Sequence, residues 1–122
     1  MPQEDDNQAH NFSRRAVIAA ATLIPVTTIA AEAPELARRI DPALPYLWAE
    51  VVHAARAEHA LEVADALARR VPLLRDARDQ GLGAVEHAAD LMARVLDWTV
   101  ERRARSVADY RTAVASSRRW RD

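Results

Sequence analysis

The sequence predicts an all-α protein, a helical hairpin or small helical bundle, and three observations carry the prediction. Alanine, the strongest helix former, accounts for 27 of the 122 residues. Apolar residues recur at helical spacing over two long segments, at about 42–70 and 84–118. Both glycines, Gly81 and Gly83, fall between these segments, where the chain must reverse if the two helices pack against each other.

The first long helix is predicted at about 42–70. Asp41 at the N-cap and Pro42 in the first helical position form a strong start signal, and Val71 before Pro72 is a stop. The apolar face of the second half is rotated by roughly a third of a turn from that of the first half, at 3.6 residues per turn. We therefore expect the first half to contact the N-terminal segment or a second subunit.

A short helix at about 73–80 and a long one at about 84–118 complete the predicted hairpin. Gly81 suits the left-handed position after the short helix, and Gly83 frees the chain to turn. The long helix has one apolar stripe, which Arg103 interrupts. At a rise of 1.5 Å per residue it is about 50 Å long, and it lies antiparallel to the first helix in this prediction.

The composition limits both the core and the chemistry. One Phe, two Tyr and three Trp leave few large side chains, so we expect a shallow core and self-association. The chain has no cysteine, which excludes disulfides and thiolate nucleophiles, and no lysine, which excludes Schiff-base chemistry. A net charge of −1 gives no reason to expect a nucleic-acid partner.

The N-terminal region has the layout of an export signal. Paired arginines at 14 and 15 precede 16 residues, 16–31, that carry no charge, and Glu32 ends this tract. Such a tract is shorter than the roughly 20 residues that a membrane-spanning helix needs. The chain is therefore divided into a leader at 1–33, a hinge at 34–41 and a helical hairpin domain at 42–122.

The leader resembles a twin-arginine translocation signal over residues 13 to about 33, and the matching residues are Ser13, Arg14, Arg15, Val17 and Ile18. This resemblance implies export machinery as a partner, cleavage near Ala31, and a periplasmic or secreted location. Two alternatives stay open: an uncleaved leader that anchors the chain in the inner membrane, and a core helix of a cytoplasmic protein. The whole chain also resembles short, uncharacterised bacterial proteins that join such a leader to an alanine-rich helical body.

The C-terminal end is basic. Residues 102–121 hold seven arginines and one acidic residue, Asp109. This composition predicts contact with an anionic partner, such as a membrane surface or an acidic protein, through Arg118, Arg119, Trp120 and Arg121. The alternative is a helix end whose cations complement the helix dipole, and nucleic acid is the least favoured partner.

Residues with catalytic or metal-binding potential are few. Glu50 and His53 have the Glu-x-x-His spacing of di-iron bundles, but the motif occurs once, and the role of the pair is left open. Glu58 and Glu62 are interpreted as surface charges. Two glycines cannot form a phosphate-binding loop, and the serines after the leader lack the glycines of a nucleophile elbow. No catalytic, cofactor or metal residue is predicted.

Three functional hypotheses follow. The first is an exported interaction or structural protein without catalytic activity, which self-associates or binds a helical partner. The second is a membrane-surface adaptor that uses the N-terminal apolar helix and the arginine-rich C-terminus. The third is a metal-binding oligomeric bundle built around Glu50 and His53.

Overall fold

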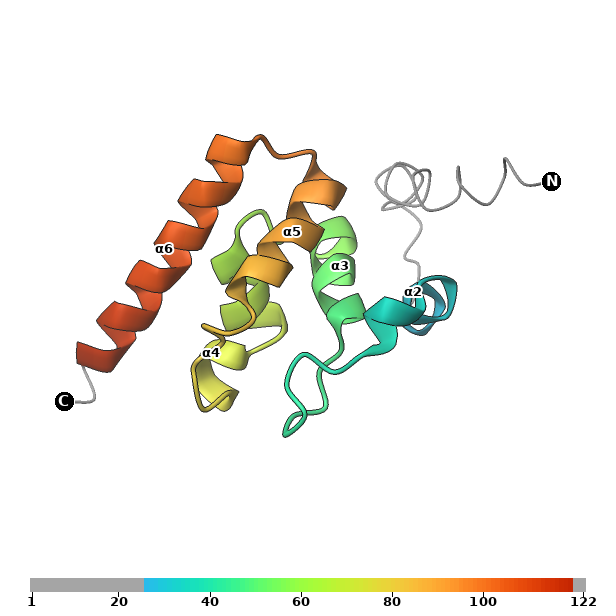
Figure 1. Ribbon diagram of the computed structural model, residues 1–122, viewed down its shortest axis with the longest axis horizontal. Coiled ribbons are helices and arrows are strands. Elements are labelled where there is room, and N and C mark those ends of the chain that lie inside the picture. The colour runs from blue at the N-terminus through green and yellow to red at the C-terminus, as the bar shows by residue number, and fades with distance from the viewer. Residues whose placement is uncertain (1–25, 120–122) are drawn as a thin grey trace.

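The computed structural model describes residues 26–119, and every named element in that part is helical (Figure 1). The prediction of an all-α small bundle is confirmed. The sole β contact in the described part is an isolated antiparallel bridge between Arg39 and Leu47. In chain order the elements are α2 Val26–Glu32, η2 Pro34–Ala37, α3 Trp48–Ala57, η3 Asp65–Arg70, α4 Leu73–Asp76, α5 Val85–Leu96 and α6 Val100–Arg119.

The end of the uncharged N-terminal tract is part of the fold. Its residues from Val26 onward form α2, which packs against α3 and η2, and the side chain of Ile29 is fully buried in the core. The segment predicted as a hinge begins with η2, whose Leu36 is also buried. Over residues 26–119, no helix is both long enough and apolar enough to cross a bilayer.

The first predicted helix, at 42–70, is wrong at its start. Residues 41–47 form a turn closed by a hydrogen bond from the backbone N–H of Ile40 to the carbonyl oxygen of Tyr46, at 2.9 Å. Pro45 disfavours helical geometry at Leu44, so α3 begins only at Trp48. The Glu50 carboxylate then accepts a 2.6 Å hydrogen bond from the N–H of Leu47 and caps the helix.

The same predicted helix is also wrong in the middle, because it breaks between Ala57 and Asp65. His59 adopts a left-handed conformation with φ of 57°, and the Asp65 carboxylate accepts hydrogen bonds from the N–H groups of Leu61 and Glu62. The chain resumes as η3, a π-helical turn. The rotation between the two apolar faces therefore reflects two separate helices that meet the core from different directions.

The predicted short helix ends early, at Asp76, and an ordered turn follows. The Asp79 carboxylate accepts hydrogen bonds from the N–H groups of Gly81 and Gly83, at 2.9 and 2.8 Å. Gly81 has a φ of 83°, as the sequence predicts for this position. This turn starts α5.

The second long helix, predicted at 84–118, is broken at Asp97, which has a φ of 57° and separates α5 from α6. After this residue the chain reverses, so that α6 runs back along the bundle (Figure 1). Thr99 accepts a 3.0 Å hydrogen bond from the N–H of Arg102 and caps α6.

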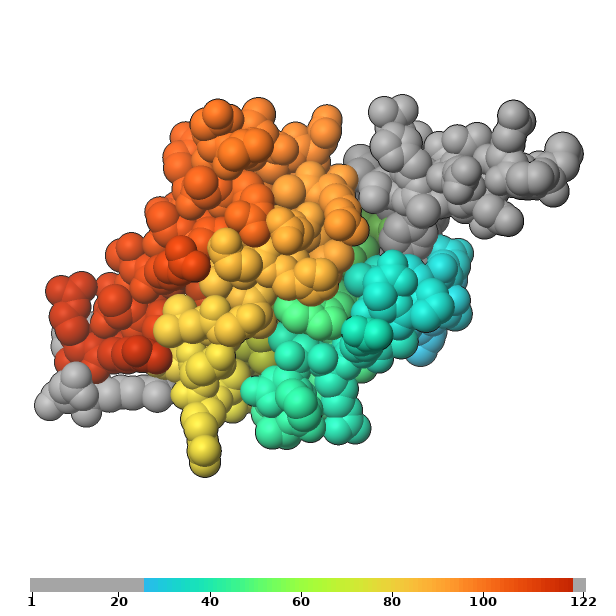
Figure 2. All heavy atoms as spheres, in the orientation of Figure 1, coloured from blue at the N-terminus to red at the C-terminus, as the bar shows by residue number. Residues whose placement is uncertain are grey.

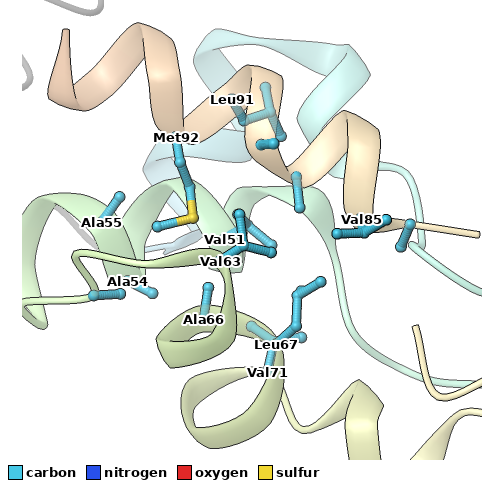
Figure 3. Close-up of a cluster of buried hydrophobic side chains, with 14 of the residues drawn as sticks. Val51, Ala54, Ala55, Val63, Ala66, Leu67, Val71, Val85, Leu91 and Met92 are labelled. Atoms are coloured by element: carbon cyan, nitrogen blue, oxygen red, sulfur yellow. The ribbon is translucent and has the colours of Figure 1, made fainter. Parts of the chain in front are cut away.

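The core lies where α3, η3 and α5 meet (Figure 3). Met92 of α5 extends toward Val51 of α3, and both side chains are fully buried. Alanines at positions such as Ala54 and Ala66 let the helix backbones approach closely. Helix α6 lies on the flank of this core and buries Val107, Tyr110 and Val114 against it.

Candidate functional site: the junction of α6 with the bundle

The polar side chains with the most interactions lie where α6 meets the rest of the bundle. Arg102 on α6 forms an ion pair with Glu62, with 2.6 Å between Nη2 and Oε1 and 2.9 Å between Nη1 and Oε2. Ser106, one turn further, donates a 2.7 Å hydrogen bond to the same carboxylate. The hydrogen bond from Arg102, aided by that from Ser106, lowers the pKa of Glu62, although partial burial opposes the shift.

The same residues fix the backbone of the segment before η3. Ser106 Oγ accepts a buried 2.9 Å hydrogen bond from the N–H of Val63, and Arg102 Nη2 donates to the carbonyl oxygen of Leu61 at 2.9 Å. The Arg102 guanidinium also lies 4.8 Å from the centre of the Trp98 ring. Glu62, which was predicted as a surface charge, is thus part of a bridge between two elements.

A second set of ion pairs joins α5 and α6 in antiparallel register. Arg103 Nε lies 2.8 Å from Asp90 Oδ1, and its Nη2 donates to the carbonyl oxygen of Glu86 at 2.8 Å. Further along both helices, Arg111 lies 3.7 Å from Glu86. The arginine that interrupts the predicted apolar stripe therefore faces α5 and pairs with it.

The third contact holds the C-terminal half of α6 against the turn around Gln80, where Figure 2 shows the two segments in contact. Tyr110 donates a 2.5 Å hydrogen bond to the carbonyl oxygen of Gln80. Burial, followed by the charge of Asp79, raises the pKa of Tyr110 to about 12. The Gln80 side chain, itself buried, accepts a 2.7 Å hydrogen bond from Arg118 Nε.

A separate polar cluster lies between the turn before α3 and α4. Tyr46 donates a 2.6 Å hydrogen bond to Asp76, and Arg75 Nε lies 2.7 Å from the same carboxylate. The hydrogen bond from Arg75, and then that from Tyr46, lowers the pKa of Asp76 to about 2. The cluster links the 41–47 turn to α4.

The predicted anionic-contact residues fall partly within the structure. Arg118 and Arg119 end α6, while Trp120 and Arg121 lie outside the described residues. Arg118 is engaged with Gln80, and Arg119 is exposed and donates to Ser116 at 3.3 Å. Beside them a shallow groove of about 590 Å³ is lined by Leu82, Arg111, Val114, Ala115 and Arg118.

The two residues of the Glu-x-x-His motif, Glu50 and His53, have different surroundings in the structure. Glu50 is used as the helix cap, and His53 Nδ1 is buried without a hydrogen bond. Within residues 26–119, no group of three or more His, Cys, Asp or Glu side chains is placed to hold a metal ion. His87, on α5, makes an edge-on ring contact with Trp48, with 4.4 Å between the ring centres.

Sequence reasoning missed the roles of Glu62, Ser106, Tyr110 and Gln80. Two signals were present. Ser106 stands directly before Val107 in the apolar stripe of α6, and Arg103 interrupts that stripe one turn earlier. A polar side chain on a buried face needs a partner, but the sequence does not show which distant residue supplies it.

The chain is similar to part of a known group of oxidoreductases. The family model for the C-terminal domain of alpha-glycerophosphate oxidase matches residues 19–103. A glycerol-3-phosphate dehydrogenase of Mycobacterium leprae is 40% identical over 89 residues, which are 73% of this chain and 15% of that protein. Glycerol-3-phosphate dehydrogenase 2 of Mycobacterium tuberculosis is 37% identical over the same shares of the two chains. No solved structure is significantly similar to this chain.

These matches overturn the predicted export. The family match begins at residue 19, inside the uncharged tract, and Ile29 from that tract is buried in the core. The tract from residue 19 is therefore part of the domain, and the predicted periplasmic or secreted location is wrong. The signal residues Ser13, Arg14, Arg15, Val17 and Ile18 lie outside the described residues. The resemblance to uncharacterised exported proteins is superseded as well.

The predicted absence of a catalytic role is also contradicted, because the relatives are named as dehydrogenases. The same finding overturns the adaptor and metal-bundle hypotheses as functions of the chain, whereas the contact of the C-terminal arginines with an anionic partner stays a prediction. The chain spans about 15% of the length of these relatives, so it corresponds to one portion of such an enzyme. The matched segment runs through the core elements to the first turn of α6, and the chain belongs to the family of the C-terminal domain of alpha-glycerophosphate oxidase.

Proposed function

We propose that the chain acts as the C-terminal helical domain of a glycerol-3-phosphate oxidoreductase. The observation that carries this proposal is the family match over residues 19–103, which takes in α2, α3 and α5 and so the main core of the bundle. Similar stretches occur in proteins named glycerol-3-phosphate dehydrogenase. We assign the chain to the same reaction as a part of the enzyme.

Within that enzyme, this domain is assigned a supporting role. With two glycines in 122 residues, the chain has no glycine-rich loop of the kind that binds a dinucleotide. The charged side chains that form the most hydrogen bonds and ion pairs, such as Glu62 and Arg102, join one element to another. In this proposal these side chains contribute to the enzyme by keeping the helices of the domain in place.

An exchange of segments tests the proposal. In the Mycobacterium tuberculosis relative, the 89-residue matching segment is replaced by the corresponding segment of this chain. We expect the chimera to reduce an artificial electron acceptor in the presence of glycerol 3-phosphate, while a variant that lacks the segment does not. The matched control is the chimera with Leu67→Asp, which places a charge at a fully buried position. A folded chimera with no more activity than the deletion variant contradicts the proposal.

A further inference from the structure

Local interactions stabilise the turn between α5 and α6. Asp97 occupies the left-handed region with φ of 57°, where residues with a side chain are disfavoured. The N–H of Trp98 donates to the carbonyl oxygen of Ala93 at 3.0 Å, and Thr99 caps α6. Three residues, 97–99, thus make the whole connection between the two helices.

The sequence across this connection permits an unbroken helix. No glycine or proline occurs between residues 84 and 119, and the apolar stripe continues through Leu96, Thr99 and Val100. A change of residues 97–99 to ordinary helical geometry would join α5 and α6 into one helix over residues 85–119, about 52 Å long. The sequence therefore allows two conformations of this segment, the observed break and a continuous helix.

The contacts of α6 do not require that it belong to the same chain as the rest of the bundle. They are antiparallel ion pairs with α5, such as Asp90 with Arg103, and the hydrogen bond from the N–H of Val63 to Ser106. The charges favour attachment of α6 to a body and oppose pairing of two α6 helices. Helix α6 carries six arginines and two acidic residues, whereas residues 26–99 carry eight arginines and twelve acidic residues.

Exposed apolar side chains lie at the start of α6, next to the connection at 97–99. Among the described residues, the exposed large hydrophobic side chains are Val100, which is 80% exposed, and Leu61, which is 57% exposed. Val100 is the first residue of α6, and the carbonyl oxygen of Leu61 accepts a hydrogen bond from Arg102. If two chains exchange α6, their 97–99 segments meet at the twofold axis, where these side chains become covered.

We propose that this protein forms a dimer in which two copies exchange α6, each through a continuous helix over residues 85–119. Each body keeps the whole set of contacts described above, but the α6 that makes them comes from the second copy. This proposal goes beyond the proposed function and does not depend on it.

Distances between spin labels distinguish exchange from other arrangements. The chain has no native cysteine, so Glu86→Cys and Arg111→Cys in the full chain label two exposed sites that lie side by side in the unexchanged fold. In the continuous helix these positions are 25 residues apart, or about 37 Å. Doubly labelled protein is refolded with excess unlabelled protein, and separately the two singly labelled proteins are refolded together.

In the dimer we expect a distance near 37 Å within one chain and a short distance between singly labelled copies. A dimer with a short distance within each chain overturns the proposal, because α6 then stays on its own body. A protein that stays monomeric up to millimolar concentration overturns it as well.

Substitutions at Asp97 test the conformational switch. Asp97→Gly relieves the left-handed strain and weakens the continuous helix, so we expect dimerisation to weaken by on the order of tenfold or more. Asp97→Ala has the opposite preference, and the dimer is expected to strengthen by a similar factor. Asp109→Gly and Asp109→Ala, at an exposed position within α6, are the matched controls. Equal dimerisation in both Asp97 variants overturns the role of the break.

Discussion

The hydroxyl group of Tyr110 donates a hydrogen bond to the carbonyl oxygen of Gln80 at 2.5 Å, and the same hydroxyl packs against Gly81. A Cβ atom added to Gly81 would stand 2.7 Å from Tyr110 Oη. Gln80 and Gly81 both have positive φ, so this hydrogen bond fixes a turn whose backbone is unfavourable for most residues. Tyr110 thereby links the position of α6 to the start of α5.

This relationship predicts a coupling between two substitutions. Tyr110→Phe removes a buried hydrogen bond and is expected to cost about 1–3 kcal/mol of unfolding free energy. Gly81→Ala is expected to cost more than 1 kcal/mol, because of its φ of 83° and the contact with Tyr110 Oη. In the double variant the contact is absent, so the loss of unfolding free energy should be smaller than the sum of the losses in the two single variants. Urea denaturation of the four proteins measures this cycle, and strict additivity contradicts the steric contact.

The same tyrosine predicts a loss of stability at alkaline pH. Burial raises the pKa of Tyr110 to about 12, whereas an unfolded tyrosine ionises near 10. The stability from this group is complete below pH 10 and is lost as the pH rises toward 12, by roughly 2 kcal/mol. The chain has no lysine to titrate in this range.

Urea midpoints measured between pH 9 and 12 test this expectation. The decline should be clearly smaller in Tyr110→Phe. The control is Tyr46→Phe, at the other tyrosine, whose pKa is raised by its hydrogen bond with Asp76 and whose side chain is only half-buried. Equal declines in the wild type and in Tyr110→Phe would show that Tyr110 does not carry the effect.

The sequence predicts the helical class and the turn at Gly81 better than it predicts helix continuity. Gly81 in the left-handed position is correctly expected because glycine lacks a Cβ atom. The breaks at His59 and Asp97 are missed because neither residue is a glycine or proline, although His and Asp adopt positive φ more often than most residues with a side chain. At the His59 break, the segment that follows is held by distant contacts, those of Arg102 with Glu62 and Leu61, which the sequence does not reveal.

The error at the N-terminus has a related cause. An uncharged stretch behind two arginines satisfies the pattern of an export signal, but the same composition suits a helix that packs in a core. Periodicity cannot separate the two, since both are apolar over a similar length. The burial of Ile29 and the family match from residue 19 decide between them.

Ser106 is expected to be essential for the position of the 58–64 segment. Its Oγ atom is the acceptor for the buried N–H of Val63 and the donor to Glu62. In Ser106→Ala the Val63 N–H loses its partner, and we expect a cost of about 1–3 kcal/mol. Ser116→Ala, at a partly exposed position on the same helix, is the control and should change stability by less than about 0.5 kcal/mol. Thermal unfolding followed by circular dichroism gives both values, and equal effects contradict the role of Ser106.

The basic end of α6 leads to the last prediction, which concerns a partner. We propose that Arg118 and Arg119, together with Trp120 and Arg121, contact an anionic surface. The support is the excess of arginine on α6 and the groove that Arg111 and Arg118 line beside Val114. Each arginine near an anionic bilayer contributes about 1 kcal/mol at low ionic strength, and salt screens the attraction.

Co-sedimentation of the full chain with phosphatidylglycerol vesicles measures this contact. We expect binding to weaken steeply between about 50 and 300 mM salt, because the screening length shortens over this range. Binding should also fall at least tenfold when residues 118, 119 and 121 are changed to Gln. The control variant changes Arg38, Arg69 and Arg94 to Gln, which removes three charges at exposed positions outside α6 and the turn around Gln80. Equal loss in both variants indicates that net charge alone governs binding, and it contradicts a defined contact at the end of α6.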